Sequence, residues 1–234
     1  MPDLLRTIGG NLARVRSSIA EAAGRAGRRA DTIKLVGVTK YVGPEVVRAL
    51  VAAGLADLAE SRPQQLWDKA AALADLPICW HQVGHLQRNK VRRTLPLVAM
   101  VESVDSVRLA AAIDQVASEL GRRVPVLLEV NISGEAAKHG FAPSEIEGVL
   151  AAVAELRHME VRGLMGMAGL AGDLEDARRQ FAALRALRDR LRPVCPNGIT
   201  LEELSMGMSD DFEVAIEEGA TLVRIGSALF EGVL

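Results

Sequence analysis

The sequence predicts a single α/β domain over residues 1–234, a closed (β/α)8 TIM barrel with one extra helix at its N-terminus. Short apolar segments alternate with amphipathic segments until eight strands have been placed, which is typical of parallel strands joined by right-handed helical crossovers. The 234 residues also fit the roughly 200 to 250 that such a barrel uses as one unit. No Pro- or Gly-rich linker divides the series.

The predicted elements follow from apolar spacing and turn residues. The extra helix lies near 3–28, where apolar residues recur at helical intervals. Strands are predicted at 33–39, 56–61, 78–84, 97–104, 124–131, 159–167, 201–209 and 221–227. The helices between them are predicted from Pro44 onward and at about 63–73, 86–95, 105–120, 143–156, 174–192 and 210–218. Pro44 suits a first helical turn, and Asp105 is expected to cap the helix that follows it.

Composition narrows the range of partners and compartments. With 49% hydrophobic residues, 25% charged residues and a net charge of −2, the chain can bury a core and gives no sign of binding nucleic acid or an anionic membrane. The two cysteines form no disulfide framework, and Cys79 is predicted to be a small core residue. The N-terminus lacks signal-peptide features and no apolar run approaches about 18 residues, so we expect a cytoplasmic, soluble protein.

Residues suited to chemistry lie at the C-terminal ends of the predicted strands, where barrels of this class carry their sites. Lys40 follows the first strand, "SMGMS" ends the seventh and "RIGS" ends the eighth. Loops after strands seven and eight commonly bind phosphate in such barrels. The residue types there suit a phosphate. Gly207 and Gly226 let the backbone approach an anion, Ser205, Ser209 and Ser227 offer hydroxyl donors, and Arg224 carries a permanent positive charge.

A lysine that faces a phosphate pocket suggests Schiff-base chemistry with an aldehyde, because a partly desolvated amine is a usable nucleophile. The alternative is a lysine at the rim of the barrel whose ammonium group stays in solvent. The residues alone leave both interpretations of Lys40 open.

Five segments, in the same order along residues 33–230, carry a specific family resemblance: "KLVGVTKYV", "WHQVGHLQRNK", "KHGFAPSE", "RGLMGM" and "LSMGMSDDFEVAIEEGATLVRIGSALF". With them the chain resembles the pyridoxal phosphate homeostasis proteins (YggS/PROSC-like), which are similar to the N-terminal barrel of alanine racemase without its second domain.

The resemblance implies that the cofactor is pyridoxal 5'-phosphate (PLP), held on Lys40 as an internal aldimine. It also implies that the loops after strands seven and eight hold the phosphate and that Arg224 lies beside the pyridine nitrogen. The residues implied for these contacts are Ser205, Met206, Gly207, Arg224, Gly226 and Ser227. His85 and Met165 also match the family pattern and could line the pocket; the alternative for His85 is a hydrogen-bonded structural histidine. Ser61 stands where family members often have Asn, which puts an amide contact there in doubt.

The resemblance implies a non-catalytic protein that buffers or delivers PLP, because an arginine cannot readily protonate the pyridine nitrogen and so makes the ring a poor electron sink. PLP and transiently contacted apo-enzymes are then the expected partners. The alternative is a fold-type III PLP enzyme with racemase-like activity. Two-base racemisation needs a second acid or base, and Tyr41, the only tyrosine, adjoins Lys40. Because the chain ends at Leu234 without the racemase's second domain, we expect weak side activity at most and a monomer.

Two other classes fit the sequence less well. A cofactor-free Schiff-base aldolase would also use a barrel lysine, but such enzymes usually carry it on the sixth strand. The four histidines show no HExxH pattern and no carboxylate at ligand spacing, so no metal site is predicted.

Overall fold

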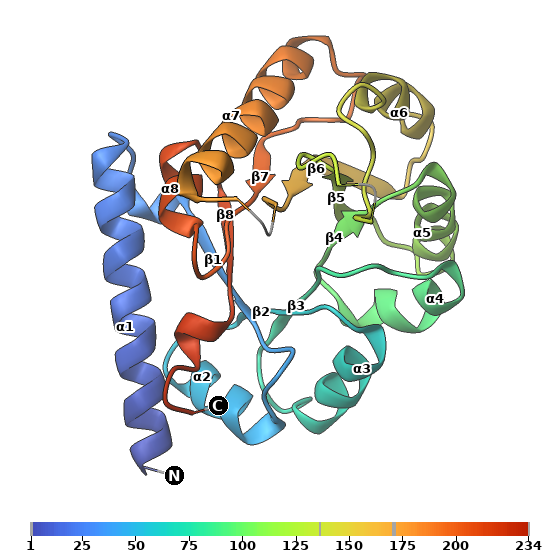
Figure 1. Cartoon of the computed structure of the whole chain (residues 1–234). Helices are drawn as coiled ribbons and strands as arrows, with labels where there is room; N and C mark the ends of the chain where they lie inside the picture. Colours follow the sequence, from blue (N-terminus) through green and yellow to red (C-terminus); the bar gives the residue numbers. More distant parts are fainter. Residues whose placement is uncertain (1, 136, 170–171, 234) are drawn as a thin grey trace.

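The computed structural model describes residues 2–135, 137–169 and 172–233. In these residues eight parallel strands close into a barrel in chain order, and β8 pairs with β1 (Figure 1). The strands are β1 (Lys34–Val38), β2 (Asp57–Glu60), β3 (Cys79–Gln82), β4 (Met100–Val104), β5 (Val124–Val130), β6 (Met159–Gly166), β7 (Glu203–Ser205) and β8 (Leu222–Ile225). The predicted TIM barrel is confirmed.

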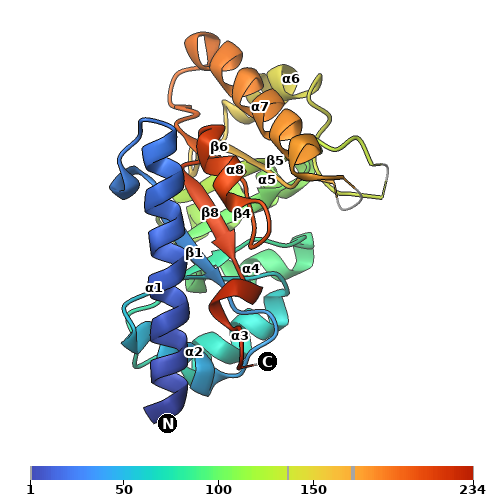
Figure 2. The ribbon, with the colours of Figure 1, turned by 60° about the vertical axis from the view of Figure 1, so that its left-hand side comes forward.

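Helices surround the barrel, and the extra helix α1 (Pro2–Arg25) lies outside their ring against α2 and α8 (Figures 1 and 2). The remaining helices are α2 (Pro44–Ala52), α3 (Pro63–Ala72), α4 (Val91–Thr94), α5 (Val107–Glu119), α6 (Ile146–Val153), α7 (Leu174–Leu191) and α8 (Phe212–Glu217). Pro44 occupies the first turn of α2, as predicted. No described helix has the length and apolarity needed to cross a membrane.

Some predicted boundaries change for identifiable reasons. The helix predicted at 86–95 becomes a short α4 between two 3-10 turns, and Pro96 opens the second turn. The cap of α5 is not Asp105 but Ser106, whose hydroxyl accepts a hydrogen bond from the Leu109 amide at 3.2 Å. Cys79 is exposed rather than in the core, because it is the first residue of β3, where the strand enters from solvent.

The buried apolar side chains form two clusters. The larger one fills the space between strands and helices, and the smaller one lies inside the barrel. The inner cluster consists of Val36, Ala59, Met100, Leu127, Met165 and Leu222. Val38, Val83 and Met167 pack above it and form the apolar floor of the cavity described next.

Candidate functional site

A cavity of about 470 Å³ opens at the C-terminal ends of the strands. Six of the predicted site residues line it: Lys40, Ser61, Ser209, Arg224, Gly226 and Ser227. The rest of the lining is Val38, Tyr41, Val83, Gly84, Met167, Met208, Asp210 and Phe230. The loops after β1, β2, β3, β6, β7 and β8 all contribute, as the parallel topology requires.

Lys40 lies at the mouth of this cavity. Its side chain is exposed, and its Nζ lies 4.8 Å from the centre of the Tyr41 ring, a cation–π contact. The structure therefore does not show the partly desolvated amine that the sequence suggested. What it does show is an accessible ammonium group held over an aromatic face at the edge of the cavity.

A buried polar cluster fixes the turn that carries Lys40. Lys69 from α3 donates hydrogen bonds to the Thr39 carbonyl oxygen at 2.6 Å and to the Glu60 carboxylate. The Thr39 hydroxyl also donates to Glu60, at 2.7 Å. Glu60 is fully buried, and its second oxygen Oε2 has no hydrogen-bond partner among the described residues. The Lys69–Glu60 ion pair thus ties the end of β1 to β2 and α3.

The wall formed after β7 and β8 suits an anion. Ser209 Oγ accepts hydrogen bonds from the Gly226 amide at 3.2 Å and the Ala228 amide at 3.4 Å. A Cβ on Gly226 would meet only Val38, at 3.6 and 3.8 Å, which is ordinary contact. Packing therefore does not require glycine at 226. The missing side chain leaves open space in the cavity beside the hydroxyl groups of Ser209 and Ser227.

Arg224 faces the cavity from inside the barrel and is 4% exposed. Its guanidinium donates to Ser205 Oγ and, at 3.0 Å, to the Gly166 carbonyl oxygen. Ser205 in turn donates to Glu102, whose other oxygen lies 2.6 Å from His81 Nδ1. This buried polar chain crosses the barrel interior from β8 to β3.

The charges along the buried polar chain alternate. Burial opposes protonation of His81, but its contacts with Asp57 and Glu102 outweigh this and raise the pKa of His81 to about 9. Burial likewise opposes ionisation of Glu102, yet His81 and Arg224 hold the pKa of Glu102 below its ordinary value. Cationic His81, anionic Glu102 and cationic Arg224 therefore coexist at neutral pH. Burial raises the pKa of the nearby Glu129 to about 7, with a further contribution from Asp105.

The other five predicted site residues lie outside the cavity lining. Met165 belongs to the inner apolar cluster, one side-chain layer below Met167, which does line the cavity. Ser205 is also one layer too deep and is occupied by Arg224 and Glu102. Met206 points outward into the packing between strands and helices, since side chains alternate along a strand.

Gly207 has a structural reason to be glycine. Its φ is +93°, and a Cβ there would lie 2.6 Å from Ala215 Cβ and 2.9 Å from Phe212 Cα. The residue permits the tight connection between β7 and α8, and its carbonyl oxygen accepts a hydrogen bond from the Arg224 amide at 3.0 Å.

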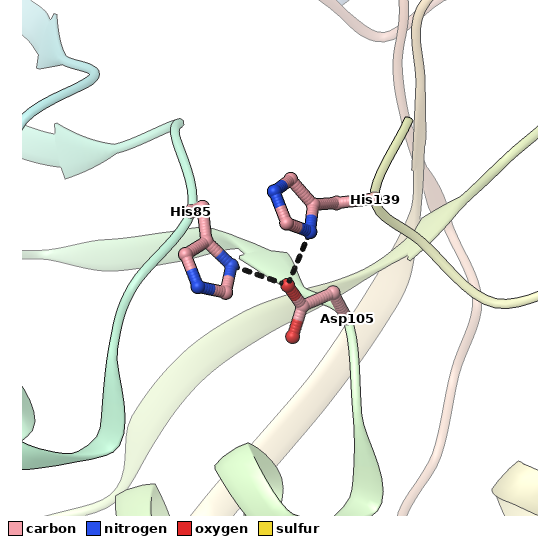
Figure 3. Close-up of side chains that lie close together, drawn as sticks. All are labelled: His85, Asp105 and His139. Carbon is pink, nitrogen blue, oxygen red and sulfur yellow. Dashed lines mark hydrogen bonds and ion pairs between the residues drawn. The ribbon is translucent and has the colours of Figure 1, made fainter. Parts of the chain in front are cut away.

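His85 is likewise outside the cavity around Lys40. Its ring stacks on His139 with 4.2 Å between ring centres, and its Nδ1 lies 2.7 Å from Asp105 Oδ2 (Figure 3). His85 instead lines a second cavity, of about 850 Å³, together with Asp105 and the start of α5. Sequence spacing indicated no carboxylate near the histidines, but the loops after β3, β4 and β5 bring these three side chains together.

The comparisons with known proteins agree with the fold. The profile of the family described as "Alanine racemase, N-terminal domain" matches residues 11–232. The pyridoxal phosphate homeostasis protein of Aquifex aeolicus is 42% identical over 219 residues, which cover 94% of this chain and 95% of the relative. That of Pseudomonas aeruginosa is 41% identical over 226 residues, which cover 97% and 96%.

Among solved structures, PipY of Synechococcus elongatus PCC7942 with PLP bound has a TM-score of 0.85 and 33% identity, and the match covers 95% of this chain and 99% of PipY. An alanine racemase of Clostridium difficile 630 has a TM-score of 0.75 at 19% identity, with 97% of this chain matched to 59% of the racemase; this likeness shows the fold alone.

Fold and site together define an alanine racemase-type barrel with a lysine at its mouth. The chain belongs to the pyridoxal phosphate homeostasis protein family.

Proposed function

We propose that this protein binds PLP in the cavity around Lys40 and acts in PLP homeostasis, as a non-catalytic carrier that buffers or delivers the cofactor. The observation that carries the proposal is that one cavity holds an accessible primary amine, a buried guanidinium and the glycine-and-serine wall after β7 and β8. The names of the relatives and the PLP-bound PipY support the same ligand.

Different cavity residues would contact different parts of PLP. PLP would supply an aldehyde, and the Lys40 amine would be the group that binds it, as a Schiff base with loss of water. Beside Gly226, the hydroxyl groups of Ser227 and Ser209 would receive the phosphate group, since hydroxyls are natural donors to it. Arg224 and Ser61 would be the polar groups available to the pyridine ring. Val83 and Met167 would provide apolar surface for it.

A carrier fits the site better than an enzyme does. Arg224 already donates to Ser205 and Gly166, is surrounded by the buried polar chain and stays cationic, so it offers no proton to a ring nitrogen. Tyr41, the only tyrosine, lies beneath the ammonium group of Lys40. A racemase needs a second acid or base on the opposite face of the substrate. The proposal retains the expectation of a cytoplasmic monomer that transfers PLP to apo-enzymes.

The test is the visible spectrum of the protein mixed with PLP, followed by borohydride reduction and mass spectrometry of the labelled peptide. Wild type should show a yellow Schiff-base band and carry the reduced label on Lys40, whereas Lys40→Ala should lose both. Lys34→Ala is the matched control, because Lys34 is at the opposite end of the same strand. A band of equal strength in Lys40→Ala, or a label on another lysine, would contradict the assignment of Lys40.

The same samples separate the carrier from the racemase. PLP-loaded wild type should leave L-alanine unracemised while it restores activity to an apo-form PLP enzyme faster than spontaneous release allows. Steady racemisation with multiple turnovers would favour the fold-type III enzyme instead.

A further inference from the structure

Three side chains outside the PLP cavity have the chemistry of a metal site. His85, Asp105 and His139 each offer one ligand atom, and these atoms all lie within 4.8 Å of one another (Figure 3). Both histidines turn Nδ1 toward the same oxygen, Asp105 Oδ2, at 2.7 Å for His85 and 3.7 Å for His139. Among the described residues this is the one cluster that brings histidines and a carboxylate together in this way.

The ligand set selects the class of metal. Two imidazole nitrogens and one carboxylate oxygen are typical of Zn²⁺ sites that keep a fourth position open for water. Calcium and magnesium prefer oxygen ligands throughout, and a thiolate-preferring ion would need cysteine. The side chains of His85 and His139 are 42% and 59% exposed, so an ion can reach both. The side chain of Asp105 is 8% exposed, and its carboxylate lies beneath the two histidine rings.

The present arrangement needs only a local change to close on an ion. Two ligands at about 2.1 Å from one Zn²⁺ can be at most about 4.2 Å apart, slightly less than the 4.8 Å limit seen here. The two rings are stacked with 12° between their planes, and an ion cannot lie in both planes at once. His139, on the loop after β5, is the more exposed of the two and is free to rotate out of the stack.

We propose that His85, Asp105 and His139 form a Zn²⁺-binding site that links the loops after β3, β4 and β5 at the rim of the barrel. Binding replaces the contact of both Nδ1 atoms with Asp105 by three bonds to the ion and unstacks the rings. Arg88 and Arg108 line the neighbouring cavity and weaken the attraction for a cation, but both are exposed, so solvent and salt screen their charges. The site is separate from Lys40 and does not depend on the PLP proposal.

Isothermal titration of tag-free, chelator-treated protein with ZnCl₂ tests the proposal. Wild type should bind one Zn²⁺ saturably, and His139→Ala and Asp105→Asn should each weaken binding by more than about tenfold. His158→Ala is the matched control, since His158 is also 42% exposed and lies 3.9 Å from a single carboxylate, that of Asp114. This control should bind as tightly as wild type.

Two further readouts make the outcome decisive. Co²⁺ should give visible bands in wild type that His139→Ala lacks, and circular dichroism should show that the His139→Ala variant is folded, since this side chain is on the surface. Absence of saturable 1:1 binding in wild type would overturn the proposal. Equal affinity in wild type, His139→Ala and Asp105→Asn would also overturn it and would place any bound zinc elsewhere.

Discussion

Replacement of Glu102 by Gln should destabilise the protein in a pH-dependent way. Glu102 is fully buried between His81 and the pair formed by Ser205 and Arg224. Gln keeps the size of the side chain but removes the negative charge. Removal of one partner from a buried ion pair costs about 3 to 5 kcal/mol, because the remaining charge stays buried without compensation. We therefore expect the free energy of unfolding at pH 6 to fall by about 3 kcal/mol or more.

The pKa of His81 gives an independent magnitude. Its value in the folded protein is about 9, against 6.5 for an ordinary histidine, and each pH unit corresponds to 1.36 kcal/mol. Protonated His81 thus contributes roughly 3 kcal/mol, fully present below pH 6.5 and lost as pH rises toward and through 9. The side chain is 3% exposed, so solvent screening removes little of this. In Glu102→Gln only the more distant Asp57, at 3.5 Å, remains to hold the proton.

Urea denaturation followed by circular dichroism at pH 6.0, 7.5 and 9.5 measures both effects. The difference between wild type and Glu102→Gln should be largest at pH 6.0 and shrink by pH 9.5, where His81 has lost its proton in both proteins. Glu119→Gln is the control; Glu119 pairs with Arg92 on the surface, and exposed ion pairs contribute little. A difference under about 1 kcal/mol at pH 6.0, or one that stays constant up to pH 9.5, would refute the charge assignment.

Two more substitutions separate binding from stability. Gly226→Ala should weaken PLP binding in a spectroscopic titration and leave the urea midpoint unchanged, because the added methyl group enters the cavity at ordinary contact distance from its protein neighbour. Gly207→Ala should instead lower the free energy of unfolding by about 1 to 3 kcal/mol. The φ of residue 207 is +93°, and an added Cβ would lie only 2.6 Å from Ala215 Cβ. Equal urea midpoints for the two variants would contradict this contrast. Lys69→Met should cost about 3 to 5 kcal/mol in the same urea assay, because it leaves buried Glu60 unpaired. A Lys69→Met variant as stable as wild type would contradict this contribution of the ion pair.

The sequence predicted which residues reach the cavity edge when the position depended only on where a strand ends. Lys40, Ser61 and Ser227 lie within two residues of the ends of β1, β2 and β8, and a parallel barrel places all such positions on one face. Depth inside the barrel was less predictable. Met165 and Met167 share a face, so alternation alone cannot say which of the two meets a ligand; the tilt and register of β6 against its neighbours decide it.

Contacts between distant loops were not visible in the sequence. His85, Asp105 and His139 belong to three separate connections, and no spacing rule joins them. Glu102 was missed for a different reason, since it lies in a segment that is otherwise suited to a fully buried strand. All five residues of β4 are indeed buried, Glu102 included. A lone acid in such a strand predicts a buried cationic partner, and that signal could have led to His81 and Arg224.

The buried polar chain follows from the position of Arg224. A guanidinium at the floor of a cavity loses most of its water, so it needs an anion close behind it. Glu102 provides that charge through Ser205, but a fully buried carboxylate has a second oxygen to satisfy. His81 satisfies it by keeping a proton, and Asp57, whose side chain is 33% exposed, balances His81 where the barrel meets solvent. The requirement to hold one cation rigidly at the cavity thus accounts for Ser205, Glu102, His81 and Asp57 along the barrel interior.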